Sequence, residues 1–171
     1  MDQQLKHENN RFTKNQFPIT LVCDRVNSPA NIGSIFRIAD SFGVERIHFC
    51  GENVTVISKR MQRTARSTHE IIPYEQSEQI MDVIQQLKTE DYTILSLEIT
   101  KDSIPVSEYR LTSSEKIAIV IGEENLGVSE NLLAVSDQIV HITMHGNNSS
   151  MNVATATGIA LYEITKQLTV D

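Results

Sequence analysis

The stretch KIAIVIGEENLG, residues 116–127, decides the fold class. An unbroken apolar run, IAIVI, follows Lys116, and such a run is typical of a strand buried on both faces of a parallel sheet. Gly122 ends this strand, and the polar loop behind it runs to a second glycine, Gly127. Parallel neighbours need crossover connections, which are usually helices. The sequence should therefore alternate strands with helices on either side of this stretch.

The rest of the chain shows that alternation. Short apolar runs predict strands, and apolar residues at helical spacing predict the connecting helices. We expect strands over residues 17–23, 44–50, 71–74, 92–99, 116–121 and 138–143. We expect helices over residues 30–42, 77–88, from about 129, and 150–168, with residues 101–114 polar and irregular. This order predicts an α/β domain with a mostly parallel sheet and helices on both faces.

Length and composition indicate one globular domain. The 171 residues contain no repeat or Gly/Ser linker, and 40% hydrophobic with 22% charged residues is ordinary for such a domain. We expect a flexible polar N-terminal arm over residues 1–16 and a single domain over 17–171. The sequence has no run long enough to span a bilayer and no signal-peptide stretch, so we expect a cytoplasmic protein. Cys23 and Cys50 lie in apolar runs and are expected to be buried free thiols.

The charge is unevenly distributed. A formal net charge of −7 argues against a protein coated with positive charge for nucleic-acid binding. One local exception exists, because four cations and no acid occur between residues 59 and 66: Lys59, Arg60, Arg63 and Arg66. By spacing alone, a solvated face is the commoner origin of such a run.

Three strand ends carry unusual polar residues, namely residues 27–33, 122–127 and 143–152. Open parallel sheets bind ligands beyond the carboxyl ends of their strands, so these segments should share one site. Structural roles remain open for single residues: Asn31 as a helix cap, Arg37 as a partner of Asp40, the glycines as turns, and Ser149 or Ser150 as caps. His141 and His145 have no third ligand nearby, so we expect no metal site.

Together the three segments resemble the three motifs of the SpoU/TrmH family of RNA 2′-O-methyltransferases, in the SPOUT superfamily. The matching stretches are Asn31-Ile-Gly-Ser-Ile-Phe-Arg37, Gly122-x-Glu124-x-x-Gly127 and Ile142-Thr-Met144-x-Gly146-x-x-x-Ser150-Met-Asn152-Val153. The resemblance runs from about residue 18 to 166. Thr143 stands where the family usually has proline and Met151 where it usually has leucine, and neither change removes a functional side chain.

The resemblance implies features of the fold and of the function that hydrophobic periodicity cannot show. It implies a C-terminal trefoil knot, S-adenosyl-L-methionine as the cofactor, RNA as the substrate with tRNA favoured, and a homodimer whose active site lies at the subunit interface. A ribosomal RNA methyltransferase and a catalytically inactive knotted RNA-binding protein are the alternatives. A base methyltransferase of the other knotted branch is less favoured, because its cofactor loop and carboxylate base are not found.

The resemblance also assigns residues. The catalytic positions are Asn31, Arg37, Glu124, Ser150 and Asn152, and the cofactor positions are Leu97, Glu98, Gly122, Gly127, Ile142, Met144 and Met151. In this context Lys59, Arg60, Arg63 and Arg66 become candidates for RNA binding, together with Arg25. The family role of Arg37 is to activate the ribose hydroxyl. A guanidinium is a poor base, so we expect Arg37 to grip a phosphate and stabilise developing alkoxide charge.

Overall fold

The computed structural model describes residues 12–112 and 114–169. Most of the arm expected over residues 1–16 lies outside this part of the chain, and its last five residues, 12–16, are exposed. Asn15 nevertheless contacts the folded domain, because its carbonyl oxygen lies 2.1 Å from the place that a Cβ on Gly43 would take. In the described part of the chain, no helix is long and apolar enough to cross a membrane.

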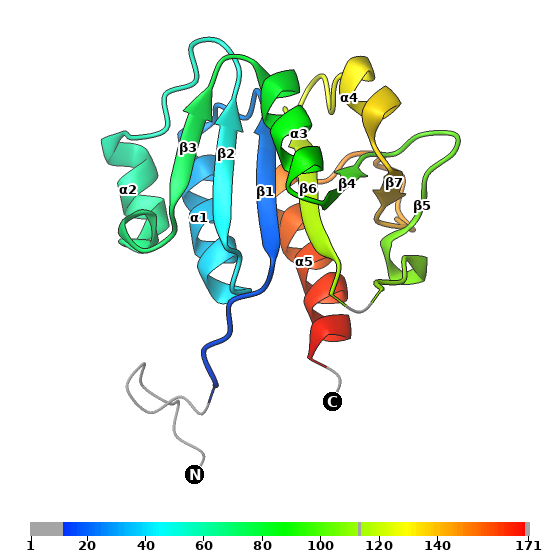
Figure 1. Cartoon of the computed structure of the whole chain (residues 1–171). Helices are drawn as coiled ribbons and strands as arrows, with labels where there is room; N and C mark the ends of the chain where they lie inside the picture. The colour runs from blue at the N-terminus through cyan, green and yellow to red at the C-terminus, as the bar shows by residue number, and fades with distance from the viewer. Residues whose placement is uncertain (1–11, 113, 170–171) are drawn as a thin grey trace.

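Seven strands form one sheet in which every pair is parallel (Figure 1). The order across the sheet is β3-β2-β1-β6-β4-β7-β5. The strands are β1 (Ile19–Asp24), β2 (Arg46–Cys50), β3 (Tyr74–Ser77), β4 (Tyr92–Leu97), β5 (Ile104–Pro105), β6 (Lys116–Gly122) and β7 (Gln138–His141). The apolar run after Lys116 is therefore the central strand, paired with β1 and β4. The predicted α/β class with a parallel sheet is confirmed.

Helices cover both faces of the sheet, as predicted. They are α1 (Pro29–Ser41), α2 (Lys59–Ala65), α3 (Ile80–Thr89), α4 (Glu130–Val135) and α5 (Val153–Leu168). Successive residues of β1 alternate between two cores, because strand side chains point to opposite faces. Leu21 and Cys23 pack with α1, α2 and α5, whereas Val22 packs with α3 and α4. Both Cys23 and Cys50 are buried free thiols, as expected.

The basic stretch forms helix α2, which the sequence did not predict. Its N-cap is Ser58, whose hydroxyl accepts a hydrogen bond from the Met61 amide at 3.2 Å. Only Met61 and Ala65 of this helix are buried, and two positions four residues apart give a weak periodic signal. Helix α2 packs against α1 where a Cβ on Gly33 would lie 2.6 Å from the Met61 carbonyl oxygen. A small residue in α1 therefore permits this close approach.

Other predicted boundaries were wrong by a few residues. Strand β3 begins at Tyr74 because a 3-10 turn, η2 (Thr68–Glu70), lies just before its predicted start. The stretch expected to be irregular contains β5 and the 3-10 turn η3 (Val106–Glu108). Helix α5 begins at Val153 rather than near residue 150 because Asn152 is its N-cap.

Parallel strands bring their carboxyl ends to one edge of the sheet, where the three polar segments follow β1, β6 and β7. Behind the sheet, α5 runs beside α1 (Figure 1). The chain thus returns from β7, near one edge of the sheet, to pack against a helix that follows β1. The threading of this segment through a loop, which would make the trefoil knot, stays a prediction.

Candidate functional site

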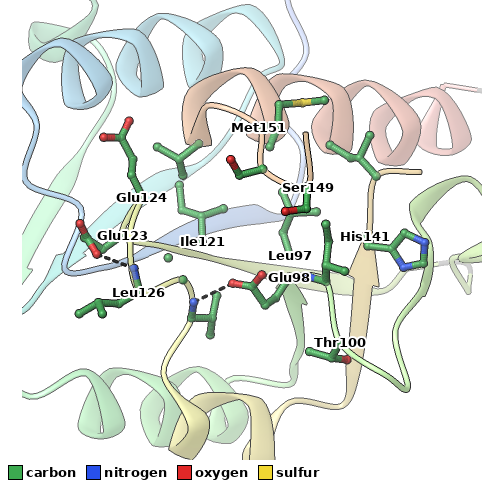
Figure 2. A pocket seen from close by; sticks show the side chains of 18 of the residues that line it. Leu97, Glu98, Thr100, Ile121, Glu123, Glu124, Leu126, His141, Ser149 and Met151 are labelled. Carbon is green, nitrogen blue, oxygen red and sulfur yellow. Dashed lines mark hydrogen bonds between the residues drawn. The ribbon is translucent and has the colours of Figure 1, made fainter. Parts of the chain in front are cut away.

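A cavity of about 440 Å³ lies at the carboxyl ends of β4, β6 and β7 (Figure 2). We call it the larger cavity, and its size falls within the roughly 300–1,000 Å³ typical of small-molecule sites. All seven residues that the sequence assigned to the cofactor line it: Leu97, Glu98, Gly122, Gly127, Ile142, Met144 and Met151. The structure thus brings together residues that are up to 54 positions apart in the sequence.

Two glycines allow the backbone to close around this cavity. A Cβ on Gly122 would lie 2.1 Å from the carbonyl carbon of Gly127 and 2.3 Å from the Val128 nitrogen, so the end of β6 touches the returning loop backbone to backbone. Gly127 has a φ of +66°, and a Cβ there would lie 2.3 Å from Oε2 of Glu98. Both positions therefore require glycine for reasons beyond an ordinary turn.

Carboxylates hold the loop between these glycines. Oε2 of Glu123 accepts hydrogen bonds from the amides of Asn125 at 3.1 Å and Leu126 at 2.8 Å. Burial opposes ionisation of Glu123, but these hydrogen bonds lower its pKa overall. On the other side of the cavity, Glu98 accepts hydrogen bonds from the amides of Val128 and Ile99, each at 2.9 Å (Figure 2). The loop is therefore fixed at both ends by negative charge.

Arg25 braces the same loop from the end of β1. Its guanidinium forms a bidentate pair with Asp24, at 2.9 and 3.1 Å, and donates to the carbonyl oxygen of Gly127 at 3.1 Å. Asp24 is only 2% exposed and also accepts from the Ser129 amide at 2.9 Å. The RNA-binding role expected for Arg25 stays a prediction, but this side chain is already committed to the loop. Asp24 was not predicted as part of the site, although an acid that ends an apolar strand was a usable signal.

The three polar segments meet in one hydrogen-bonded cluster. The side-chain amide of Asn31 donates to Oε1 of Glu124, and Asn152 Nδ2 donates to Asn31 Oδ1 at 3.0 Å and to Glu124 Oε1 at 3.3 Å. Asn152 Oδ1 also accepts from the amides of Ala154 and Thr155, at 3.0 and 3.2 Å, so it caps α5. The alternative that Ser149 or Ser150 caps this helix is not observed, because the helix begins later and Asn152 is its N-cap.

Ser150 and Arg37 lie apart from this cluster. Ser150 lines the larger cavity and donates its hydroxyl to Asn148 Oδ1 at 3.2 Å. Arg37 follows Asn31 by six residues of α1, or about 240° around the helix, so it points elsewhere. It is exposed and its side chain forms no hydrogen bond or ion pair with the described residues; the alternative pairing with Asp40 is not observed there. Arg37 therefore lines neither this cavity nor its smaller neighbour.

The four cations predicted between residues 59 and 66 all lie on the surface of α2 and its C-cap. Lys59, Arg60, Arg63 and Arg66 are exposed, and none forms a salt bridge within residues 12–112 and 114–169. Gly33 and Arg37 lie one helical turn apart on α1, and α2 packs on Gly33. Arg37 therefore projects from the side of α1 that faces this basic helix.

The far wall of the larger cavity contains polar residues that the sequence patterns did not predict. His141 ends β7 and shares a 2.9 Å hydrogen bond between its Nδ1 and the Ser103 hydroxyl. Thr100 lines the same cavity, and its hydroxyl is buried with no hydrogen-bond partner in the described chain. Thr100 and Ser103 come from the stretch around the irregular segment that follows β4. No group of three or more His, Cys, Asp or Glu in the described residues is arranged to hold a metal ion.

Comparisons with known proteins agree with this geometry. The sequence profile of the SpoU rRNA Methylase family matches residues 18–162. A tRNA (guanosine(18)-2'-O)-methyltransferase of Escherichia coli strain K12 is 27% identical over 156 residues, which cover 91% of this chain and 66% of that protein. A 23S rRNA (guanosine-2'-O-)-methyltransferase of Bordetella pertussis is 28% identical over 149 residues, covering 87% of this chain and 60% of that protein.

A solved structure has the same fold. The AdoMet-bound rRNA methyltransferase from Sinorhizobium meliloti aligns with a TM-score of 0.83 and 23% identity, over 94% of this chain and 60% of that chain. The chain thus spans about two thirds or less of the length of these three proteins.

Proposed function

Since this chain belongs to the SpoU rRNA Methylase family, we propose that it transfers a methyl group from S-adenosylmethionine to a ribose 2′-hydroxyl of RNA. The observation that carries this proposal is the cluster of Asn31, Glu124 and Asn152 beside the larger cavity. A methyl transfer to a hydroxyl needs the two substrates held in line at close range. Three segments distant in the sequence converge here, and Glu124 of this cluster lines the larger cavity, which supports a binding role for these side chains.

The larger cavity fits the cofactor. Ile142, Met144 and Met151 would form apolar walls for the adenine ring, and Gly122 leaves backbone accessible for its polar edge. Leu97 and Glu98 would lie against the ribose or the methionine part. When bound, S-adenosylmethionine supplies an electrophilic methyl group on a sulfonium. The rRNA methyltransferase from Sinorhizobium meliloti supports this choice, since that protein has the same fold and is bound to AdoMet.

The proposed catalytic role of Arg37 requires the proposed homodimer. Arg37 is exposed and lies outside the cavity of its own chain, so it reaches a reaction site only if a second copy presents it there. A surface stripe of α5, made by Thr155, Ile159 and Tyr162, is exposed beside α1 and offers apolar area for such a contact. In the dimer, Arg37 would grip the phosphate next to the target nucleotide and stabilise the developing alkoxide.

Mixing two inactive variants tests this arrangement. Arg37→Ala and Asn152→Ala should each abolish activity alone. If the two residues act in one site from different copies, co-refolding both variants should restore about a quarter of wild-type activity, because half of the dimers then hold one intact site of two. A mixture as inactive as its components, or a protein that stays monomeric in light scattering, would refute the shared site.

The exposed cations of α2 provide the proposed RNA surface. Their side chains form no salt bridge within the described chain and lie on the side of α1 from which Arg37 projects. Reversing the charges of Arg60, Arg63 and Arg66 should weaken RNA affinity and flatten its dependence on salt. Arg110→Glu is the matched control, because Arg110 follows β5 at the opposite edge of the sheet from α2. Equal losses in both variants would argue against a defined RNA surface.

For the substrate we propose tRNA, with ribosomal RNA as the second candidate. Relatives of both kinds match to a similar degree, at 27% and 28% identity. The deciding experiment incubates the protein with methyl-labelled S-adenosylmethionine and either total tRNA or ribosomal RNA. Label on tRNA at positions that resist alkaline cleavage supports the full proposal. Alkali-resistant label on ribosomal RNA would instead make ribosomal RNA the substrate. Label at positions that alkali still cleaves, or no label on either RNA, would refute ribose methylation.

A further inference from the structure

The acidic and basic side chains that line the larger cavity are all of one sign. Three carboxylates line it, those of Glu98, Glu123 and Glu124, and no lysine or arginine of the described residues does. An adjoining cavity of about 150 Å³ shares Glu123 and Glu124 with it, and its lining within the described chain also has no lysine or arginine. Figure 2 shows these three side chains around the larger cavity. A charged ligand therefore meets carboxylates here and no cation from the cavity wall.

His141 is the remaining titratable residue of this lining, and its contact requires no positive charge. The Ser103 hydroxyl has one hydrogen, which it donates to the Thr100 carbonyl oxygen at 2.8 Å. The hydroxyl oxygen accepts from the Thr100 amide at 3.0 Å, and it can only accept from Nδ1 of His141 at 2.9 Å. A neutral imidazole with its proton on Nδ1 satisfies this arrangement. His141 therefore adds no fixed cation to the cavity.

Arg25 contacts the loop that lines the cavity, but its charge is already paired. Its guanidinium forms the bidentate pair with Asp24, and the two charges cancel. Its further contact is with the uncharged carbonyl oxygen of Gly127, and it also attracts the Glu123 carboxylate. No salt bridge in the described chain includes Glu98 or either loop glutamate. The cavity therefore keeps a negative charge that the protein does not balance.

Glu98 is the carboxylate that two chain segments fix at the cavity wall. Oε1 accepts from the Ile99 amide and Oε2 accepts from the Val128 amide, each at 2.9 Å. Oε2 also lies 2.3 Å from the place that a Cβ on Gly127 would take. Neither donor is charged, so the two hydrogen bonds hold the carboxylate in place without neutralising it.

The two loop glutamates are less available to a ligand. Glu123 uses both of its oxygens within its own loop, for the Asn125 side chain and two amides. Glu124 is exposed, so water screens its charge, and its Oε1 accepts from Asn31 and Asn152 while its Oε2 has no partner in the described chain. Glu98 is therefore the carboxylate best placed to act on a ligand inside the larger cavity.

We infer that the larger cavity selects its ligand by positive charge, and that Glu98 makes it prefer S-adenosylmethionine to the product S-adenosylhomocysteine. This inference rests on the proposed function. The two ligands share their adenine, ribose, ammonium and carboxylate groups and differ at sulfur. When the bond from the methyl carbon to sulfur breaks, the electron pair stays on sulfur, so the sulfonium becomes a neutral thioether. The net charge of the ligand thus falls from one positive charge to none.

Selection by charge gives the cavity a means of releasing its product. Opposite charges attract more strongly in a partly enclosed site than in bulk water, because the effective dielectric constant is lower there. Methyl transfer removes this attraction when the product must leave. Hydrogen bonds to the adenine or the ribose are the same for both ligands and cannot produce such a difference. The ratio of the two affinities is therefore a specific measure of the effect of the carboxylates.

Three ligands of different charge test the inference on the wild-type protein by isothermal titration calorimetry. S-adenosylhomocysteine has no net charge, S-adenosylmethionine has one positive charge, and decarboxylated S-adenosylmethionine has two. At an ionic strength of about 0.05 M, S-adenosylmethionine should bind about tenfold more tightly than the product, and the decarboxylated ligand at least as tightly as S-adenosylmethionine. At about 1 M salt the preference over the product should fall below about threefold, because salt screens the attraction.

Two results of this titration would overturn the inference. The first is an affinity for S-adenosylhomocysteine within about twofold of that for S-adenosylmethionine at low salt. The second is binding of the decarboxylated ligand about tenfold weaker than that of S-adenosylmethionine. The protein would then recognise the methionine carboxylate, which requires a positive group in the cavity rather than a surplus of carboxylates.

Glu98→Gln tests whether this residue supplies the selection. Glutamine keeps the size of the side chain and one acceptor oxygen, and binding of S-adenosylhomocysteine shows that the variant is folded. Its preference for S-adenosylmethionine should fall from about tenfold to below about threefold. Glu108→Gln is the matched control, because Glu108 is an exposed residue of η3 that does not line the cavity and forms no salt bridge in the described chain. It should keep the full preference.

An unchanged preference in Glu98→Gln, even with both affinities reduced, would mean that Glu98 only holds the loop or binds the ribose, and would refute its role in selection. Equal losses of preference in both variants would point to the net charge of the protein instead. The proposed function fails by a different result. A protein that prefers S-adenosylmethionine but methylates no RNA would refute ribose methylation, whereas one that methylates RNA and binds both ligands equally would refute only the selection by charge.

Discussion

Replacing Gly122 with alanine tests whether the backbone contact behind the larger cavity controls cofactor binding. The new Cβ would lie 2.1 Å from the Gly127 carbonyl carbon and 2.3 Å from the Val128 nitrogen. Ordinary carbon contacts begin near about 3.5 Å, so the returning loop must retreat by roughly 1 Å or more. The hydrogen bond from Val128 to Glu98, now 2.9 Å, and that from Arg25 to Gly127, now 3.1 Å, would then exceed hydrogen-bonding distance.

Both bonds involve a charged group, and such bonds contribute about 1.5–3 kcal/mol each, less where they are solvent-exposed. Arg25 is partly exposed, so we expect a total loss of about 2–4 kcal/mol. Part of this free energy should be lost only from the loop conformation that binds the cofactor. The Kd for S-adenosylmethionine should then rise at least about tenfold, which corresponds to about 1.4 kcal/mol. Isothermal titration calorimetry measures the Kd, and urea unfolding measures the loss of folding free energy.

Gly146→Ala is the matched control for this prediction. It makes the same chemical change in a neighbouring loop, but nothing lies within 4 Å of its Cβ position. It should bind S-adenosylmethionine like the wild type. A Gly122→Ala variant with a Kd within about twofold of wild type, or equal losses in both variants, would refute the reasoning that the 122–128 contact shapes the cavity.

Three further predictions follow from contacts outside the catalytic cluster. Arg25→Ala should raise the Kd for S-adenosylmethionine by about threefold to tenfold, because the loop loses the hydrogen bond that holds it and solvent screens part of that contact. Arg25→Gly should bind S-adenosylmethionine equally weakly. It should unfold at a higher urea concentration than Arg25→Ala, since alanine keeps the strained φ of +59°. Gly33→Ala should lower the free energy of unfolding by about 1–3 kcal/mol, because its Cβ pushes α2 away from α1, and a thermal melt would show no change if α2 adapts freely. Burial lowers the pKa of His48, although the carboxylate of Glu75 opposes the shift. The imidazole therefore binds a proton at about pH 6.5 in the unfolded chain but only at lower pH in the folded protein. Stability is therefore complete above that pH and falls as the pH decreases toward the lower folded pKa; His48→Leu should reduce this acid slope in urea titrations, and an unchanged slope would contradict it.

Much of the site was predictable because its residues occur in continuous stretches. Asn31, Glu124 and Asn152 each lie at a strand end or at the start of a helix, and the rule that parallel strands share a ligand-binding edge was enough to predict their meeting. The seven cofactor positions follow from the same rule and from the family motifs. Helix α2 was missed because only Met61 and Ala65 are buried in it, and its stability comes from packing on Gly33 rather than from its own pattern.

The sequence by itself determined the α/β class, the central buried strand after Lys116 and the segments that form the site. These follow from hydrophobic periodicity and from glycine and asparagine at strand ends, which are local properties of the chain. Tertiary structure alone decided that Arg25 serves the loop, that Arg37 projects away from its own cavity, and that Glu124 keeps one oxygen free of partners in the described chain. The physical reason is that a side chain's partners depend on which elements the fold places around it, and no spacing along the chain records those distances.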